Sequence, residues 1–222
     1  MAGTATISWI GNPAPTGLQF VSNTSASANN VSSTSLAGVT AGAFMVLACA
    51  AADECTTATT VNITGTSLTW TKQVANPCGS HSGSIEIWTA PCPAGGTVSP
   101  ICTWAGGTTA ATSSVLYAVT GQEAVAAGTS GSQQLGATPS VAVTTGKNNS
   151  ILFCVTSDWN AVNTAPTYRD GAVQILLDNT HPLAYIGYHY YKQAGAAGSY
   201  TEGLSAPGGQ SSGTGVYEVR IP

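Results

Sequence analysis

"SLAGVTAGAFMVLACAAAD" (Ser35 to Asp53) aligns with "SVAVTTGKNNSILFCVTSD" (Ser140 to Asp158) at an offset of 105 residues. The alignment places Cys49 on Cys154, and an aspartate ends both stretches. Each stretch holds a polar turn followed by a run of apolar residues, a pattern typical of a buried strand. The pair therefore indicates an internal duplication of a β-rich unit.

The match continues in the same order along the chain. "IEIWTAPCPAGGTV" (85–98) and "IGYHYYKQAGAAGSY" (186–200) both give an aromatic strand, an Ala-Gly turn and another strand. "SSVLYAVTG" (113–121) and "GVYEVRIP" (215–222) then close the two halves with Val- and Tyr-containing strands. Three segments in register predict two repeats.

Residue alternation gives the fold class. In "GVYEVRIP", Tyr217, Val219 and Ile221 are expected on one face, with Glu218 and Arg220 on the other. Short strands of this kind are separated by turns rich in Gly, Ser and Asn, and helix signals are scarce. The sequence therefore predicts an all-β protein: an antiparallel, jelly-roll-like β-sandwich with an internal duplication, stapled by disulfides.

The expected organisation has three parts. Residues 1–22 form an N-terminal arm, residues 23–35 a polar linker or loop, and residues 36–222 the sandwich. The sandwich is built from repeats at about 36–121 and 140–222. We expect their strands to interleave in one jelly roll, because each half offers few strands to cover a core of its own.

Composition excludes several classes of function. Charged residues are 6% of the chain and Lys plus Arg total five, too few to neutralise a row of phosphates, so we expect no nucleic-acid partner. The run "AGAFMVLACAAA" (41–52) is shorter than the roughly 20 residues that span a bilayer, and predicts a strand buried on both faces rather than a membrane anchor. The opening "MAGTATISWIGN" has neither the basic nor the apolar region of a secretory signal.

The six cysteines are expected to be structural. They fit no zinc-binding spacing, and none lies in a nucleophile motif. Cys92 and Cys102 flank an Ala-Gly-Gly turn, and we expect a disulfide between them across a hairpin. We further expect Cys55 to bond Cys78, which leaves Cys49 and Cys154 as buried thiols or as a bond between the repeats.

The order "G-x-F-M-V-L-A-C-A-A-A", "SLTWTKQ", "IWTAPCPAGGTVS", "SSVLYAVTG" resembles a jelly-roll domain of tailed-phage virion structural proteins, which include head decoration, head fibre and minor tail proteins. The resemblance covers residues 30–222, and the cysteines depart from it. It implies a non-enzymatic protein on the outside of a particle, in contact with the major capsid or tail protein and with copies of itself in a homotrimer. A virion protein is made without a signal peptide and is exposed to oxidising surroundings after lysis, which accounts for disulfides without an export signal.

Three aromatic features are candidates for contacts. Trp9 and Ile10 give the arm apolar area, so we expect them to dock on the particle. Trp159 lies in an expected loop and is the candidate for ligand contact, with a host-surface glycan as the possible ligand. The tyrosines of "YIGYHYY" (185–191) alternate between two faces, which favours core or interface positions over one exposed platform.

Other functions remain as alternatives. A carbohydrate-binding or adhesin module would share the sandwich, and a hydrolase could use two carboxylates from distant strands. Asp53 and Asp158 could contribute to a calcium site, although each is more simply explained as a turn cap. We expect no enzyme, no metal and no cofactor.

Overall fold

Antiparallel strands form the regular structure of the protein. The computed structural model describes residues 18–26, 31–53, 60–76, 83–105, 109–123, 129–158, 165–178 and 186–221. The strands of the first repeat are β1 (Leu18–Ala26), β2 (Val31–Ser33), β3 (Leu36–Val39), β4 (Ala43–Asp53), β5 (Thr60–Thr64), β6 (Thr71–Asn76), β7 (Ser84–Cys92), β8 (Gly96–Val98), β9 (Ile101–Ala105) and β10 (Thr109–Val119). Those of the second are β11 (Thr129–Ala137), β12 (Ser140–Thr145), β13 (Ile151–Asp158), β14 (Thr167–Tyr168), β15 (Val173–Asp178), β16 (Ile186–Gln193), β17 (Gly198–Ala206) and β18 (Gln210–Val219).

Within the described residues, the only helical element is the short 3₁₀ turn Arg169–Gly171. No helix in this part of the chain is both long and apolar enough to cross a membrane. The expected all-β, antiparallel architecture is therefore confirmed.

The two repeats have the same strand order. The first forms a five-stranded sheet β1-β10-β4-β7-β6, and the second forms β11-β18-β13-β16-β15. Smaller sheets complete each repeat: β2-β9-β5 and β3-β8 in the first, β12-β17-β14 in the second. Each strand of one five-stranded sheet thus has a counterpart in the other, with β4 matching β13 at the centre.

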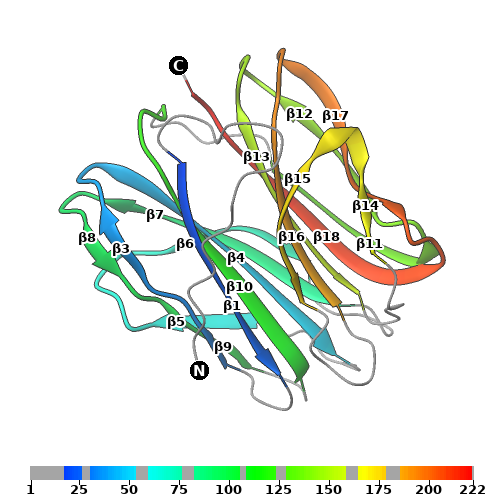
Figure 1. Ribbon diagram of the computed structural model, residues 1–222, viewed down its shortest axis with the longest axis horizontal. Coiled ribbons are helices and arrows are strands. Elements are labelled where there is room, and N and C mark those ends of the chain that lie inside the picture. Colours follow the sequence, from blue (N-terminus) through cyan, green and yellow to red (C-terminus); the bar gives the residue numbers. More distant parts are fainter. Residues whose placement is uncertain are drawn as a thin grey trace.

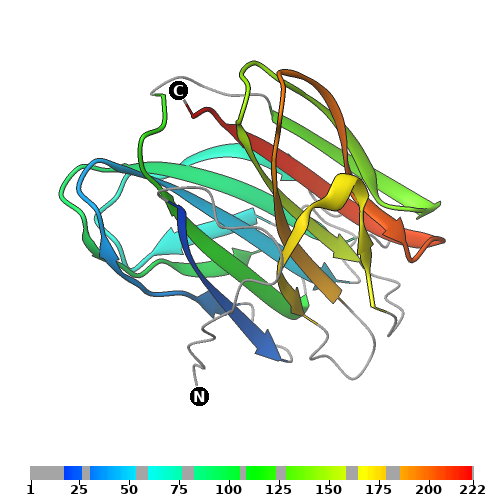
Figure 2. The same ribbon diagram turned by 45° about the horizontal axis from the view of Figure 1, so that its top comes forward.

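The two five-stranded sheets pack face to face, and the small sheets cover their outer faces. Side chains from both large sheets form one central core, which includes Val46 and Phe153. Each repeat has one further core, which lies between its large sheet and its own small strands. Figure 1 shows the first repeat, coloured blue to green, beside the second, coloured yellow-green to red, and Figure 2 shows the same arrangement after a turn.

The central strands are apolar on both faces because both faces are covered. Along β4, Val46 and Ala48 point into the central core, while Met45 and Leu47 point into the outer core of the first repeat. This alternation agrees with the period of two in a strand. The prediction of a strand buried on both faces is confirmed for residues 43–51. Residues 41 and 42 of the predicted run lie in the turn before β4.

The expected interleaving of the repeats is wrong. Every sheet of the described structure takes its strands from one repeat only. Each repeat covers one face of its large sheet with its own short strands, and it buries the other face against its partner repeat. The strands are therefore numerous enough to form a double layer in each half.

The expected arm and linker also need correction. Residues 18–22 belong to β1, which pairs with β10 along its whole length. Residues 23–26 continue that strand and residues 31–33 form β2, so much of the expected linker is part of the sheets. The second repeat begins at β11, before the expected boundary at residue 140.

The expected equivalence of the aligned stretches is confirmed. Cys49 and Cys154 lie at matching positions on β4 and β13, and both are fully buried. Asp53 and Asp158 each end their strand. The alternation expected for the last strand also holds, since Tyr217 and Val219 pack in the central core.

Candidate functional site

Several expected site residues lie outside the described residues. These are the docking residues Trp9 and Ile10, the pair Cys55 and Cys78, and the ligand candidate Trp159. The expectations attached to them remain predictions.

The expected hairpin between Cys92 and Cys102 does not form. Cys92 ends β7, which pairs with β4 and β6, whereas Cys102 lies in β9, between β2 and β5. The chain leaves one sheet and enters another between the two cysteines, so the Ala-Gly-Gly turn joins β7 to β8 across the sandwich. Both side chains are thiols in the structure.

Cys102 instead faces Cys49 of β4. Their Sγ atoms are 3.6 Å apart, and neither side chain is exposed. In β7, the residue opposite Cys49 is Glu86, and Cys92 lies six positions further along. At about 3.3 Å per residue this is roughly 20 Å along the strand, which explains why Cys92 does not reach the pair.

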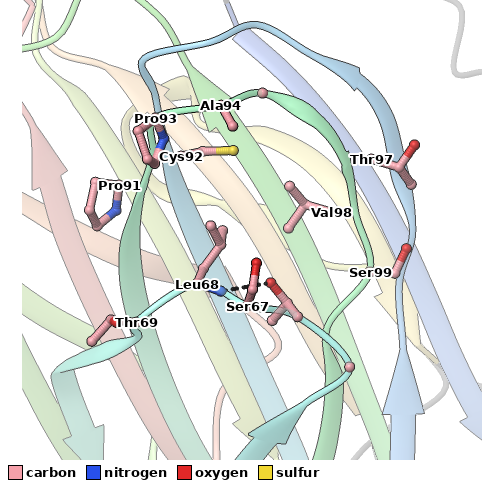
Figure 3. Close-up of a pocket in the computed structure, with 13 residues that line it drawn as sticks. Ser67, Leu68, Thr69, Pro91, Cys92, Pro93, Ala94, Thr97, Val98 and Ser99 are labelled. Carbon is pink, nitrogen blue, oxygen red and sulfur yellow. Dashed lines mark hydrogen bonds between the residues drawn. The ribbon is translucent and has the colours of Figure 1, made fainter.

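One hollow lies at the tip of the first repeat. Its volume is about 530 Å³, and it is formed by the loop 65–69 and the turn region 91–99 (Figure 3). Figure 3 shows Thr97 and Ser99 across the hollow from Pro91 and Pro93. The lining has no charged side chain, and its hydroxyl groups come from Thr66, Ser67, Thr69, Thr97 and Ser99.

Two of these hydroxyls already have partners. Thr66 Oγ1 accepts a hydrogen bond from the Leu68 backbone N–H at 3.2 Å, and Ser99 Oγ lies 2.7 Å from Ser35 Oγ. The hollow can therefore offer hydrogen bonds to a neutral polar ligand, but it has no acid–base pair for catalysis.

Glu86 is a buried carboxylate that joins three strands. Lys72 Nζ and Thr60 Oγ1 donate to its Oε1 at 2.6 and 3.0 Å, while the Val61 backbone N–H and Trp88 Nε1 donate to its Oε2 at 3.1 and 2.8 Å. The side chain is only 3% exposed. Because all four donors are protein groups, the carboxylate is held in a structural hydrogen-bond network and is not free to act on a substrate.

A second hollow, of about 240 Å³, lies where the repeats meet. It is lined by two acidic side chains, Glu123 and Glu218, and by Arg220. Glu123 pairs with Lys147 at 2.9 Å, and Glu218 accepts hydrogen bonds from the Gly146 backbone N–H and from Ser150 Oγ. Each acid is thus engaged with donors of the second repeat, which favours a role in joining loops to the sheet.

Glu202 differs from these acids. It lies on β17, it is fully buried, and neither carboxylate oxygen has a hydrogen-bond partner among the described residues. Burial raises its pKa to about 7, an effect that Lys192 opposes and Asp170 reinforces. The carboxyl group is therefore neutral in weakly acidic solution, and the neutral form is the one that an apolar environment favours.

His189 forms a buried contact between the repeats. Its Nε2 lies 2.8 Å from Ser113 Oγ of β10, and burial lowers its pKa to about 3. A serine next to a histidine also occurs in hydrolases, but there the base is oriented by a third group. Here Nδ1 has no partner among the described residues, and neither side chain is exposed. The pair therefore joins the two large sheets.

The described tyrosines of the stretch 185–191 and Asp158 are also buried. Tyr188 and Tyr190 pack in the outer core of the second repeat, and Tyr191 packs in the central core, so the expectation of core positions is confirmed for these three. Asp158 is fully buried. No group of three or more His, Cys, Asp or Glu side chains suited to a metal occurs in the described part of the chain.

Sequence reasoning missed the buried acids. Glu86, Glu202 and Glu218 all lie inside strands and are buried, and residue alternation did not predict their burial. The available signal was an acid flanked by apolar residues, as in "SIEIW" and "VYEV", within a chain of very low charge. Such an acid must find partners or change its pKa when the strand is buried.

Comparison of the chain with protein-family models, with curated proteins and with solved structures finds no match.

Proposed function

We propose that the protein is a non-enzymatic structural protein on the outside of a phage particle, a capsid decoration or fibre subunit, and that each repeat is a jelly roll. The observation that carries the proposal is the strand order. If β2 with β3, and β8 with β9, count as single interrupted strands, each repeat has eight strands in the order 1-8-3-6-5 and 2-7-4. A jelly roll has eight strands in two sheets. Each repeat departs from the usual jelly-roll order in one respect, since its fifth strand joins the larger sheet.

The distribution of charge supports a structural role. The described ion pairs of Glu86 and Glu123 link neighbouring strands and loops. Among the described residues, His189 bridges the two large sheets, and Tyr188 and Tyr190 pack in the outer core of the second repeat. Stability therefore depends on packed cores, as expected for a protein that must last outside the cell.

The outer face of β2-β9-β5 supports assembly with a second copy of the chain. None of these strands contains a charged residue, and Val31 and Ile101 are 40% and 38% exposed on it. The interior of an interface is depleted of charged residues in the same way. Light scattering should show a defined oligomer. The double substitution Val31→Lys and Ile101→Lys should shift the association equilibrium toward the monomer.

The decisive experiment is purification of the native particle. We expect the protein at a fixed ratio to the major capsid or tail protein, measured by quantitative mass spectrometry. Deletion of residues 1–17, which stops before β1, should leave a folded protein that no longer binds the particle. Absence of the full-length protein from purified particles would overturn the proposal, whereas binding by the truncated protein would overturn only the role of the arm.

The uncharged hollow favours a second function, contact with a glycan. Its hydroxyl groups and nearby apolar side chains suit a neutral sugar. A glycan array with the wild-type protein, with Ala94→Trp to fill the hollow and with Trp159→Ala would test it. Loss of a sugar signal in either variant would support glycan binding, and an array without any signal would exclude it for the glycans displayed.

A further inference from the structure

Cys49 and Cys102 are the two described thiols whose sulfur atoms meet. Their Sγ atoms are 3.6 Å apart in a contact between β4 of the large sheet and β9 of the small one. Fifty-three positions separate them in the chain, so the contact arises from the packing of two layers and not from a local turn. Both side chains are fully buried.

The surroundings hold both cysteines in place. Cys49 lies between Ser114 and Glu86 in the large sheet, and Cys102 lies between Ser32 and Ile63 in the small sheet. Both strands are paired on each side, so their backbones are fixed relative to their own sheets. A disulfide requires an S–S distance of about 2.05 Å, which side-chain rotation and a small approach of the two layers could supply.

We infer that Cys49 and Cys102 form a disulfide that joins the two layers of the first repeat when the protein meets oxidising conditions. This pair differs from the Cys92–Cys102 pair that the sequence suggested, because Cys102 bonds a cysteine of another sheet. The inference does not depend on the proposed function. It places the covalent link between the sheet that packs on the second repeat and the sheet that faces outward.

The chemistry is thiol–disulfide exchange with a small-molecule disulfide such as oxidised glutathione. One cysteine thiolate attacks the small disulfide, which forms a mixed disulfide and releases one small thiolate. The second cysteine thiolate attacks the protein sulfur of that mixed disulfide, which forms the Cys49–Cys102 bond and releases the second small thiolate. The two cysteine protons end on the two small thiols, so two protein thiols are oxidised and one small disulfide is reduced.

Burial determines when this exchange can occur. Burial and the hydrogen bond to Cys102 raise the pKa of the Cys49 thiol, which makes its thiolate scarce in the closed structure. We therefore expect the bond to form while the chain folds, or when the small sheet opens from the large one. In the closed, reduced protein it should form slowly.

The second repeat provides a matched control. Cys154 occupies the position of Cys49, but its Sγ contacts the Leu152 backbone carbonyl. Burial raises the pKa of the Cys154 thiol, and the nearby carboxylate of Glu202 raises it further. No thiol of the described residues lies beside it. Cys154→Ser should therefore leave disulfide formation in the first repeat unchanged.

The test uses the full chain with Cys55→Ser and Cys78→Ser, so that neither of these cysteines can contribute a bond. The protein is refolded with a mixture of reduced and oxidised glutathione, its remaining thiols are alkylated in denaturant, and the unreduced digest is mapped by mass spectrometry. We expect a linked pair of peptides carrying Cys49 and Cys102, with a mass lower by two hydrogen atoms. The thermal midpoint should fall by roughly 5–10 °C on reduction.

Cys102→Ala should abolish this redox-dependent shift, and Cys154→Ser should retain it. Because the mapping uses intact Cys49 and Cys102, it remains decisive even if the alanine variant fails to fold. Full alkylation of both cysteines after refolding, or a linked pair that joins Cys102 to Cys92, would overturn the inference.

Discussion

Glu202 is a buried acid whose pKa is raised to about 7, so it gives the protein a pH-dependent stability. Because the folded state binds the proton more tightly than the unfolded state, its contribution is fully present below the usual pKa of 4.5 and is lost as the pH rises through about 7. A change from 4.5 to about 7 corresponds to about 3 kcal/mol. Glu202→Gln stays neutral, so its advantage in free energy of unfolding should grow from near zero at pH 4.5 to that value at pH 8.

Urea unfolding of both proteins across this range measures the difference. His189 also titrates here with the opposite sign, because its lowered pKa makes stability fall as the pH drops below 6.5. It is present in both proteins, so the difference between them isolates Glu202. A difference that stays constant between pH 4.5 and 8 would contradict the assignment.

Glu86 is a buried acid with a different environment, since its two oxygens accept four hydrogen bonds from protein groups. In Glu86→Gln, the side-chain NH₂ group would replace one carboxylate oxygen and face the two groups that now donate to that oxygen. These buried donors would lose their acceptor. We expect a loss of about 2–3 kcal/mol in the free energy of unfolding.

The matched control is Glu123→Gln. Glu123 pairs with Lys147, whose side chain is 50% exposed, and such pairs contribute under about 1 kcal/mol. Denaturant unfolding of the two variants should therefore separate them clearly. Equal losses would show that the Glu86 hydrogen bonds contribute no more than a surface ion pair.

At the scale of the elements, β18 depends on glycine to approach β7. A Cβ atom at Gly213 would clash with the backbone carbonyl oxygen of Gly83, which lies just before β7 in the other repeat. Because a backbone atom cannot rotate away, Gly213→Ala should push the two sheets apart and cost about 2–3 kcal/mol. Gly198→Ala on β17 meets nothing within 4 Å and should change stability by less than about 0.5 kcal/mol.

Thermal unfolding monitored by tryptophan fluorescence would compare the two variants. If Gly213→Ala were as stable as Gly198→Ala, the close approach of β18 and the start of β7 would not limit the packing of the repeats.

The sequence predicted the elements better than their arrangement. Alternation in "GVYEVRIP" and the aligned stretches 35–53 and 140–158 identified strands, faces and equivalent positions, because these depend on local periodicity. The partner of each face could not be predicted in this way. β4 and β13 are apolar on both sides, so periodicity does not say which face meets the other repeat.

The candidate site was predicted less well for the same reason. The Cys92–Cys102 hairpin was inferred from nearness in the sequence, whereas Cys102 meets Cys49 through the packing of two sheets. The role of Glu202 likewise depends on which side chains the second repeat brings around it. Contacts between layers carry no local signal in the sequence.

At the scale of the whole molecule, the central core makes each repeat depend on the other. The tilted rings of Tyr117 and Phe153 pack across it with their centroids 4.5 Å apart, Ser157 Oγ donates to the Ala51 carbonyl at 2.7 Å, and Ser113 meets His189. Apolar side chains of both large sheets fill the rest of this core. A separated repeat would expose one face of its five-stranded sheet to water, which costs free energy in proportion to the apolar area exposed.

We therefore predict that residues 1–123 and 124–222, expressed as separate polypeptides, do not form stable monomers. Each should aggregate or pair with itself through the exposed sheet, and refolding of the two together should yield a one-to-one complex. Size-exclusion chromatography with light scattering gives the stoichiometry, and Tyr117→Ala in the first polypeptide should weaken the complex by removing the ring that packs on Phe153, at a cost of about 3–5 kcal/mol. A soluble, cooperatively folded monomer of either half would show that each outer core is sufficient alone, and that the central core is a contact between independent domains.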